Sequence, residues 1–570
     1  MSAMITTVNR VDGVYEAEVA VRLVIVKFNI YTDLTNQPFT DSSGSMLLSQ
    51  NQTVCDGPVT ANTGPGDAGY DIGHVFTTGG GGLASLGVVG QSGRKARGET
   101  GSSAPSGDAY DIDYVAHEIG HEFGAEHPFN AIDAGSCTTS TRAVDAAYEP
   151  GSGTTIMAYA GICNPQNVQP NSDPYFHTKS FDQIIAYTTD GGPGDTSGVQ
   201  TPTGNFPPVV NAGANYTIPQ GTPFTLTAVG SSPNNNPLTY SWEEFDLGAP
   251  QATPVVINAP YFRFFPPTVS PSRAFPNMNS LLANTPTPYE VLPTTDQTLN
   301  FRITARDNKA GGGVNYAAMQ VVISGAPFTL ANRTSTFSWN AGTTPTVTWT
   351  VGGGSVASNV DILLSTNGGA TFTPLVSNVP NSGSATVTVP AVATTTGRLK
   401  IQSVGNIFFD VSRADFTIVN SPTISGTLAF EGISQTAPAQ NVTFTFRPKT
   451  GAAFTQTISV PASGIFSLTN IPPAVYDVRI KGDKYLAQLV AVDTTAGNVS
   501  GVTSNQRAGD ANNDNSVDST DFGILTGAFN TSVKNAGSGY DAKADLNSDG
   551  SVDSTDFGLL IGEFNIIGSN

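Results

Sequence analysis

Charged side chains are scarce in this 570-residue chain, since Asp, Glu, Lys and Arg together make up only 12% of it. Basic residues are the scarcer of the two signs, with 25 Lys and Arg against 45 Asp and Glu, which gives a net charge of -20. Nucleic acids and anionic membranes bind clustered Lys and Arg, so the composition argues against both as partners. An acidic chain instead suits calcium.

Long apolar runs are also lacking. No stretch reaches the roughly 18 uninterrupted apolar residues that a membrane helix needs, so we expect a soluble chain with no membrane span. The opening MSAMITTVNRVDGVYE has neither the basic n-region nor the apolar h-region of a signal peptide. We therefore expect either that a leader is missing from this chain or that secretion uses another route.

Cysteine is rare and odd in number: Cys55, Cys137 and Cys163. Cys137 and Cys163 bracket a loop-rich segment and could form one disulfide in an oxidising compartment, which would leave Cys55 unpaired. The alternative is three independent thiols.

Length and composition predict several domains, because domains usually hold roughly 100 to 200 residues. The 61 Gly and 38 Pro, with tracts rich in Thr, Val, Ser and Asn, are typical of extracellular all-β modules. Residues 1–200 differ, with the helix-like ITTVNRVDGVYEAEV followed by an apolar run that predicts a strand over Val21–Thr32. This part reads as α/β or α+β.

Three β-sandwich modules are expected next. Residues 205–325, with YTIPQGTPFTLTAVG and LTYSWEEFD, resemble an immunoglobulin or PKD sandwich with Trp242 in a core strand. Residues 326–420, with TVTWTV, resemble a second Ig-like sandwich, and their STNGGATF (Ser365 to Phe372) is similar to an Asp-box hairpin. Residues 421–506, with TISGTLAF, resemble Cna-B or carboxypeptidase-regulatory domains. None of the three concentrates His, Cys or acidic residues, so we assign them spacing and surface binding.

Three of the five histidines fall within HEIGHEFGAEH, His117 to His127. On a helix, the four-residue spacing of His117 and His121 stacks two imidazoles on one face, where both can ligate one metal ion. Gly124 permits a turn that ends the helix and presents His127 as a third ligand. Three nitrogens and one water describe a catalytic zinc site, with Glu118 as general base. The alternative is a polar helix whose histidines are incidental.

The extended HExxHxxGxxH resembles the metzincin zinc peptidases, and the bacterial reprolysin-like group in particular, over about residues 1–200. The resemblance makes Met157, in TIMAYAG, the methionine of a turn beneath the zinc. It gives Tyr159 a role as switch ligand or transition-state hydrogen-bond donor. Pro128 after the third histidine is more like serralysins than reprolysins, so the subfamily stays open.

The same resemblance implies peptide hydrolysis on an edge strand. Residues Tyr70 to Gly87 look like that strand and its glycine-rich turn, while His74 and His177 are expected to be structural or loop residues. Zinc would polarise the scissile carbonyl and lower the pKa of its water, and Glu118 would pass the proton to the leaving amine. Metzincin domains open with a strand before the first helix, whereas this chain starts inside that helix. We expect an N-terminally truncated domain, which puts activity in question.

Residues 507–570 contain an internal repeat. DANNDNSVDSTDFGILTGAFN begins at Asp510 and DLNSDGSVDSTDFGLLIGEFN begins at Asp545. Oxygen donors at positions 1, 3, 5, 7, 9 and 12 of a twelve-residue loop predict one calcium ion for each repeat. The predicted ligands are Asp510, Asn512, Asp514, Ser516, Asp518 and Asp521 in the first loop, and Asp545, Asn547, Asp549, Ser551, Asp553 and Asp556 in the second.

Two such loops, each followed by one helix, resemble a small α-helical type I dockerin. The resemblance implies a cohesin partner chosen by loop positions 10 and 11, which are Ser519 and Thr520 in one repeat and Ser554 and Thr555 in the other. The alternative is a pair of acidic turns without metal.

Two functions from different classes follow. The first is a secreted or surface-attached zinc endopeptidase that acts on protein substrates and docks through calcium. The second is a non-catalytic extracellular adhesive or scaffold protein with a vestigial peptidase domain. Glu118 favours the enzyme, and the missing leader and first strand favour the scaffold.

Overall fold

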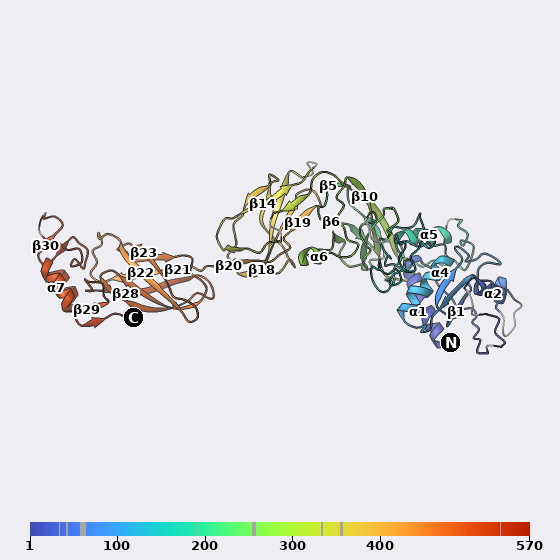
Figure 1. The fold of residues 1–570 in the computed structure, drawn as a ribbon, viewed down its shortest axis with the longest axis horizontal. Helices are drawn as coiled ribbons and strands as arrows, with labels where there is room; N and C mark the ends of the chain where they lie inside the picture. The colour runs from blue at the N-terminus through green and yellow to red at the C-terminus, as the bar shows by residue number, and fades with distance from the viewer. Residues whose placement is uncertain are drawn as a thin grey trace. The chain divides into compact units, whose positions relative to one another are not determined.

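The computed structural model describes all of the chain except residues 34, 41–43, 58–63, 190, 253–257, 332–333, 354–356, 536 and 538. The chain folds into two compact units (Figure 1). The first comprises Met1–Thr336, Thr346–Val387 and Thr396–Asp415, and the second comprises Phe337–Pro345, Thr388–Thr395 and Phe416–Asn570. The expected multidomain organisation, with helices near both ends of the chain and β modules between them, is confirmed.

The N-terminal part of the first unit combines helices with a small sheet. Its helices are α1 (Ser2–Val19), α2 (Gly44–Asp56), η1 (Asp67–Gly69), α3 (Asp108–Tyr110), the π-helical η2 (Asp111–Ala116), α4 (His117–Glu122) and α5 (Thr178–Thr188). Its strands are β1 (His74–Thr77), β2 (Gly81–Ala84) and β3 (Gly98–Gly101), in the order β1-β3-β2. Strand β1 runs parallel to β3 and β2 runs antiparallel to it.

Helix α1 packs against the continuous η2–α4 helix. Val11 and Tyr15 of α1 share a buried cluster with Ile112, Val115 and Ile119. The Tyr15 hydroxyl donates to the Ala116 carbonyl at 2.7 Å, so even the polar end of this fully buried ring is satisfied. The apolar side chains of the η2–α4 helix therefore anchor it in the core.

The strand predicted over Val21–Thr32 is wrong, because residues 21–33 form no strand. Val24 and Val26 are 69% and 65% exposed. Residues 23–31 and 74–78 line the same cavity of about 450 Å³, and β1 is an end strand of its sheet in the described chain. The apolar run has strand composition, but a strand also needs a neighbour to complete its ladder.

The first β-sandwich follows. Its elements are β4 (Val209–Asn211), β5 (Tyr216–Ile218), β6 (Phe224–Thr227), β7 (Val229–Ser231), β8 (Thr239–Glu244), β9 (Ser272–Phe275), α6 (Met278–Ala283), β10 (Gln297–Arg306) and β11 (Val314–Ile323). The main sheet has the order β5-β11-β10-β8, and β4-β7 and β6-β9 form two further pairs. Phe224, Phe262, Phe275 and Phe301 stack in its core. Trp242 lies on β8 and is 2% exposed, as expected.

The second sandwich contributes two further groups of strands. They are β12 (Phe328–Leu330), β14 (Thr346–Val351) and β17 (Ser384–Thr386) in one group, and β15 (Asn359–Ser365), β16 (Thr373–Pro380), β18 (Thr394–Ser403) and β19 (Phe409–Val411) in the other. The β15–β16 connection contains the predicted Asp-box sequence, in which the Gly369 amide donates to the Ser365 hydroxyl at 2.9 Å.

The second unit holds a third sandwich and the C-terminal repeat. Strands β13 (Ser338–Asn340) and β20 (Phe416–Val419) pair in parallel. The sandwich strands are β21 (Ile424–Phe430), β22 (Gln440–Pro448), β23 (Phe454–Val460), β24 (Ile465–Leu468), β25 (Val475–Gly482), β26 (Tyr485–Leu486), β27 (Gln488–Asp493) and β28 (Val499–Ala508), in sheets β24-β21-β28-β26 and β23-β22-β25-β27.

The C-terminal repeat is compact and symmetric. Its elements are β29 (Ser516–Val517), α7 (Ser519–Ala528), β30 (Thr531–Ser532), β31 (Ser551–Val552), α8 (Ser554–Gly562) and β32 (Ile566–Ile567). Leu525 and Leu560 of its helices belong to the same buried cluster as the third sandwich. The repeat and this sandwich therefore share one core.

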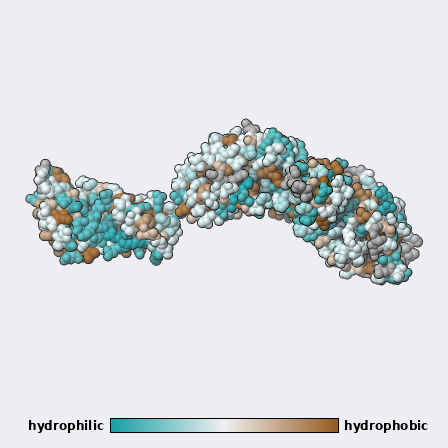
Figure 2. Space-filling view, in the orientation of Figure 1, coloured by the Kyte–Doolittle hydropathy of each residue, from teal (hydrophilic) through white to brown (hydrophobic). Residues whose placement is uncertain are grey.

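On the face drawn in Figure 2, hydrophilic and near-neutral residues dominate, and hydrophobic residues lie in small scattered groups. Within the described ranges, no helix combines the length and the apolar character needed to cross a bilayer.

The first sandwich makes a buried contact with the N-terminal part of the first unit. The Arg306 guanidinium on β10 is 1% exposed and contacts both carboxylate oxygens of Glu18 on α1, at 2.7 and 3.1 Å. It also donates to the Phe176 carbonyl at 3.1 Å. Glu18 and Arg306 are both buried, so the N-terminal part and the first sandwich pack closely enough within the first unit to exclude water from this ion pair.

We expect Arg306→Met to lower the free energy of unfolding of the first unit by about 3 kcal/mol, because Glu18 would keep a buried charge without its partner. The double variant Glu18→Met with Arg306→Met should lose less, since no charge then remains. Urea unfolding of the three proteins measures this. A single variant as stable as the native chain would show that the pair does not join the two parts.

Candidate functional site

Three imidazoles converge where α4 ends. The Nε2 atoms of His117, His121 and His127 lie 2.9 to 3.2 Å from one another. Each ring donates from Nδ1 to a backbone carbonyl: His117 to Ile156 at 2.8 Å, His121 to Ala125 at 2.6 Å and His127 to Thr141 at 2.6 Å. A carbonyl only accepts, so the ring proton is on Nδ1 and the three Nε2 lone pairs face one point.

Gly124 makes this convergence possible. Its φ is +90°, a left-handed conformation that costs a residue with a Cβ. Its amide donates to the His121 carbonyl at 2.8 Å, and the Ala125 amide donates to the Gly120 carbonyl at 2.9 Å, which closes the helix end. The chain then doubles back and brings His127 to the other two rings.

The three rings fit a zinc ion. Burial lowers the pKa of His117 to about 3 and that of His121 to about 4, and it lowers the pKa of His127 well below its usual value, so all three are neutral. Tetrahedral zinc with Zn–N bonds near 2.05 Å separates ligand nitrogens by about 3.3 Å, close to the spacing here. Three facing lone pairs repel one another unless a cation lies among them. In the described chain, no fourth His, Cys, Asp or Glu joins this group.

Glu118 is buried beside the rings, under strand β2. A Cβ on Gly82 would lie 2.3 Å from a Glu118 carboxylate oxygen, so the strand backbone passes directly over this side chain. Burial raises the pKa of Glu118 well above its usual range, and the carboxylates of Glu99 and Glu122 raise it further. The carboxyl therefore has a strong tendency to take up a proton.

His74 is not near the metal position, as its spacing predicted. Its Nδ1 lies 2.9 Å from a carboxylate oxygen of Glu122, and its Nε2 lies 2.8 Å from the Thr100 hydroxyl. Glu122 is fully buried. Sequence reasoning missed it, although a carboxylate directly after the second histidine of an internal helix is a signal, because a buried charge needs a partner.

His177 has a structural place as well. It is 1% exposed, caps α5 by accepting from the Lys179 amide at 3.1 Å, and approaches Glu243 of the first sandwich at 3.4 Å. It belongs to the contact between the N-terminal part and that sandwich.

Met157 packs beneath the histidine helix. A Cβ on Gly120 would lie 2.3 Å from the Met157 sulfur. The methionine side chain therefore packs directly against the helix backbone between His117 and His121. The preceding Ile156 supplies the carbonyl that orients His117. The turn thus acts on the metal centre through a hydrogen bond as well as by packing.

Tyr159 lies against the rings. Its ring centroid is 4.5 Å from that of His127 and 5.5 Å from that of His117, and it stacks on Phe129 at 4.7 Å. Burial raises its pKa to about 12, and Glu118 contributes to the rise, so the hydroxyl is protonated. The ring thus packs against the histidine group, and its hydroxyl can donate a hydrogen bond.

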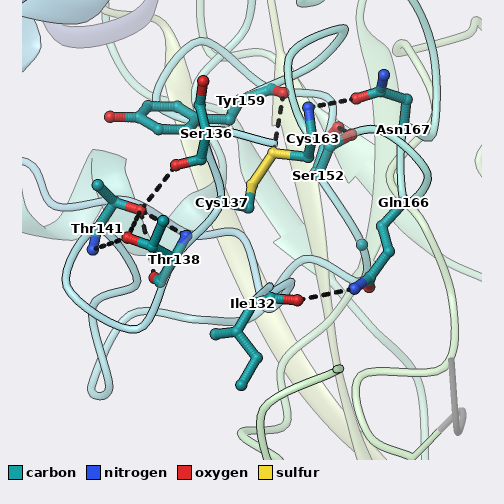
Figure 3. Close-up of a disulfide and its surroundings, with 12 residues drawn as sticks. Ile132, Ser136, Cys137, Thr138, Thr141, Ser152, Tyr159, Cys163, Gln166 and Asn167 are labelled. Atoms are coloured by element: carbon teal, nitrogen blue, oxygen red, sulfur yellow. Dashed lines mark hydrogen bonds between the residues drawn. A yellow bond between two sulfur atoms is a disulfide. The ribbon is translucent and has the colours of Figure 1, made fainter. Parts of the chain in front are cut away.

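A disulfide joins Cys137 to Cys163 beside Tyr159 (Figure 3). The Cys163 amide donates to the Asn167 side chain at 2.7 Å. Cys55 is a free thiol on α2, and burial raises its pKa to about 11. It is therefore a poor nucleophile at neutral pH.

The C-terminal repeat folds into two matching acidic loops. The loop-closing Asp521 and Asp556 are fully buried, and each accepts from two or more backbone amides of its own loop. Asp518 and Asp553 cap α7 and α8. Asp514 and Asp549 each accept from the amide two residues later, which places their carboxylates inside the turn.

These loops fit a calcium ion by the chemistry of their donors. Burial raises the pKa of Asp521, and the charges of Asp510 and Asp514 raise it further. Like charges held this close favour a divalent cation among them. The remaining predicted ligands lie in the same two turns: Asn512, Ser516, Asp545, Asn547 and Ser551.

Sequence reasoning missed two lysines of the third sandwich that hold the loops. Lys481 Nζ donates to Asp510 at 2.7 Å, and Lys484 Nζ donates to the Ser548 hydroxyl at 2.7 Å. Lys481 lies near the end of β25, and Lys484 lies in the turn that leads to β26. The sequence around these lysines does not indicate the contacts, because the loops that they bind lie later in the chain.

The predicted partner-binding residues Ser519, Thr520, Ser554 and Thr555 are exposed in the first turns of α7 and α8. Phe522 and Phe557, two residues further on, are 36% and 39% exposed, with their rings 6.2 Å apart. The repeat thus presents two similar helix faces to solvent.

Comparisons with known families agree with both ends of the chain. Residues 1–187 match the Metallo-peptidase family M12B Reprolysin-like, and residues 508–565 match the Dockerin type I domain. The chain therefore carries a reprolysin-like metallopeptidase domain and a type I dockerin, which confirms the family resemblances read from its sequence. No curated protein matches the chain.

Solved structures of β modules also resemble parts of the chain. Fibronectin(III)-like modules of Clostridium thermocellum CbhA are 10% identical, over 37% of this chain and 93% of theirs, with a TM-score of 0.13. The FN1–FN3 domains of chicken CNTN1 are 12% identical, over 50% of this chain and 98% of theirs, also with a TM-score of 0.13. The tandem Ig repeats of Dlar are 10% identical, over 37% and 96%, with a TM-score of 0.22. Scores this low carry no argument.

We expect Gly120→Ala to destabilise the first unit by about 1 to 3 kcal/mol, because the new methyl group overlaps the Met157 sulfur. Gly558→Ala in α8, where nothing lies within 4 Å, is the matched control. It should be neutral or stabilising by up to about 1 kcal/mol, since alanine favours helices. Calorimetry of both variants measures this, and equal effects would contradict the packing described here.

We expect calcium at 100 times its Kd to stabilise the dockerin by about 2.7 kcal/mol for each of the two sites, after removal of bound ions with a chelator. Asp514→Ala combined with Asp549→Ala should abolish the effect, because both loops lose a ligand while the lysine contacts remain. Asp477→Asn on an exposed strand position is the control. If calcium did not change the melting temperature of the native chain, the prediction of two calcium sites would be wrong.

Proposed function

We propose that this protein is a secreted zinc endopeptidase of the metzincin type that is attached to a partner by its calcium-dependent dockerin. The observation that carries the proposal is the convergence of three neutral Nε2 atoms, each oriented by a backbone carbonyl. His117, His121 and His127 would hold the ion and leave its fourth position open to solvent and substrate.

Residues around the three imidazole rings would carry out the proton transfer and the stabilisation of negative charge. When bound, zinc supplies Lewis-acid polarisation of the substrate carbonyl and a lowered pKa for water. Glu118 takes the proton of the attacking water and passes it to the nitrogen of the leaving amine. A carboxylate that takes this proton can hold it until the amine departs. Tyr159 donates a hydrogen bond to the oxygen on which negative charge develops.

Strand β2 is proposed as the platform for the substrate. It is the last strand of its sheet, so its outer edge has free amides and carbonyls in the described chain. An extended peptide can add to that edge by main-chain hydrogen bonds. Gly82 has no side chain, so it keeps this edge close to Glu118.

The dockerin is proposed to bind a cohesin through its two exposed helix faces. Ser519 and Thr520 in one repeat are identical to Ser554 and Thr555 in the other, so either face offers the same hydroxyls. The two loops would each take one calcium ion, which would order the helices that follow. Dockerins are typical of extracellular proteins, and the Cys137–Cys163 disulfide supports an oxidising location.

We expect Glu118→Gln to reduce casein cleavage at least about 100-fold while zinc remains bound, because the variant keeps all three imidazoles and loses only the proton acceptor. Glu16→Gln on α1, which pairs at 3.6 Å with the exposed Arg22, is the control. Zinc content by mass spectrometry and the cleavage rate are measured together. Full activity of Glu118→Gln would contradict the mechanism, and a zinc-loaded native chain that cleaves nothing would favour a non-catalytic scaffold.

A further inference from the structure

The segment that carries the third histidine has little structure of its own. No helix or strand lies between Glu122, where α4 ends, and Thr178, where α5 begins. Segments this long without regular structure are uncommon in compact domains. The position of His127 therefore depends on what surrounds this segment.

A loop of the first sandwich is one of those surroundings. Gln251 forms a parallel bridge with Ala131 and is 1% exposed. Its amide donates to the Asn130 carbonyl at 3.0 Å, and its carbonyl accepts from the Ile132 amide at 2.9 Å. The sandwich thus adds one strand-like residue to the chain just after His127.

The Gln251 side chain holds a second part of the segment. Its Oε1 accepts from the Gly151 amide at 2.7 Å. Its carbonyl also accepts from the Gln166 side chain at 2.8 Å, and Gln166 in turn donates to the Ile132 carbonyl at 3.0 Å (Figure 3). One residue of the sandwich therefore joins the stretch after His127 to the stretch that leads to the methionine turn.

Arg142 extends the same connection to the His127 ring. The preceding Thr141 carbonyl accepts from His127 Nδ1. Arg142 Nε donates to the Asn130 side chain at 2.8 Å, and its Nη2 donates to the Gly248 carbonyl at 3.1 Å. The carbonyl that orients the third imidazole is thus fixed through a side chain whose other contact is on the sandwich.

We propose that the first β-sandwich is part of the metal centre and that Gln251 is a positioning residue for His127, acting through residues 130–132 and 151. This inference rests on the proposed zinc site. Neither Gln251 nor the sandwich touches the reacting atoms. Their effect is to hold the third nitrogen where the other two converge, so loss of the contact should weaken zinc binding before it unfolds the protein.

The test compares variants of the full chain. Gln251→Met keeps the side-chain volume and removes the acceptor of the Gly151 amide, whereas Gln251→Glu retains an acceptor at that atom. Both variants lose the side-chain N–H groups that donate to the Asn258 and Pro260 carbonyls, so the pair isolates the role of the acceptor. Tyr316→Phe is the matched control, because its hydroxyl donates to Asp182 at 2.8 Å at another point of the same interface. Zinc affinity is measured by competition with a chromophoric chelator, coordination by the visible spectrum of the Co²⁺-substituted protein, and folding by the melting temperature of the apoprotein.

We expect Gln251→Met to bind zinc at least about 10-fold more weakly than the native chain, as is typical when a residue that orients a metal ligand is lost. Its Co²⁺ spectrum should change, while Gln251→Glu and Tyr316→Phe should keep the native spectrum. Native zinc affinity and an unchanged spectrum in Gln251→Met would overturn the inference. Should that variant not fold, Arg142→Lys takes its place, since one ammonium cannot replace both guanidinium contacts.

The native chain separates this inference from the proposed function. If it binds zinc but cleaves no protein substrate, the peptidase proposal fails and the comparison of zinc affinities still decides the role of Gln251. If it binds no zinc, both fail.

Discussion

Three hydrogen bonds from imidazole Nδ1 atoms to backbone carbonyls are the constraint on which the metal centre depends. The carbonyls belong to Ala125, Thr141 and Ile156, which lie in three different turns. Each bond fixes both the tautomer and the direction of one ring. The centre is therefore only as rigid as the loops that supply these acceptors, and the disulfide and the neighbouring sandwich both act on those loops.

Burial gives the same site its chemical character. The three rings stay neutral because water is excluded, and the same exclusion raises the pKa of Glu118 and of Glu122. His74 Nδ1 lies 2.9 Å from a carboxylate oxygen of Glu122. Buried carboxylates and neutral imidazoles held this close together favour a cation among them, which agrees with the proposed zinc ion.

Local sequence predicted the parts of the site that neighbouring residues determine. The spacing of His117 and His121, the turn at Gly124 and the two acidic loops all follow from short-range geometry, and the structure places these residues together. The acceptors at Thr141 and Ile156, the lysines at the acidic loops and Gln251 come from distant parts of the chain and show no pattern of their own. The prediction of a strand over Val21–Thr32 is wrong for the same reason. The composition of these residues favours a strand, but it cannot tell whether a neighbouring strand is present to pair with them.

These contacts between distant residues give the β modules a role in ordering the neighbouring loops. In the first unit, Gln251 joins two stretches of the segment between α4 and α5, which carries His127. In the second unit, Lys481 and Lys484 reach the acidic loops from the sandwich that shares their core. Loops that carry metal ligands lose conformational entropy when they are ordered, and a neighbouring domain that orders them in advance reduces what the ion must supply. The sequence pattern changes sharply between the peptidase-like or dockerin domain and its neighbouring β module. The contacts that hold the proposed metal ligands nevertheless cross that boundary.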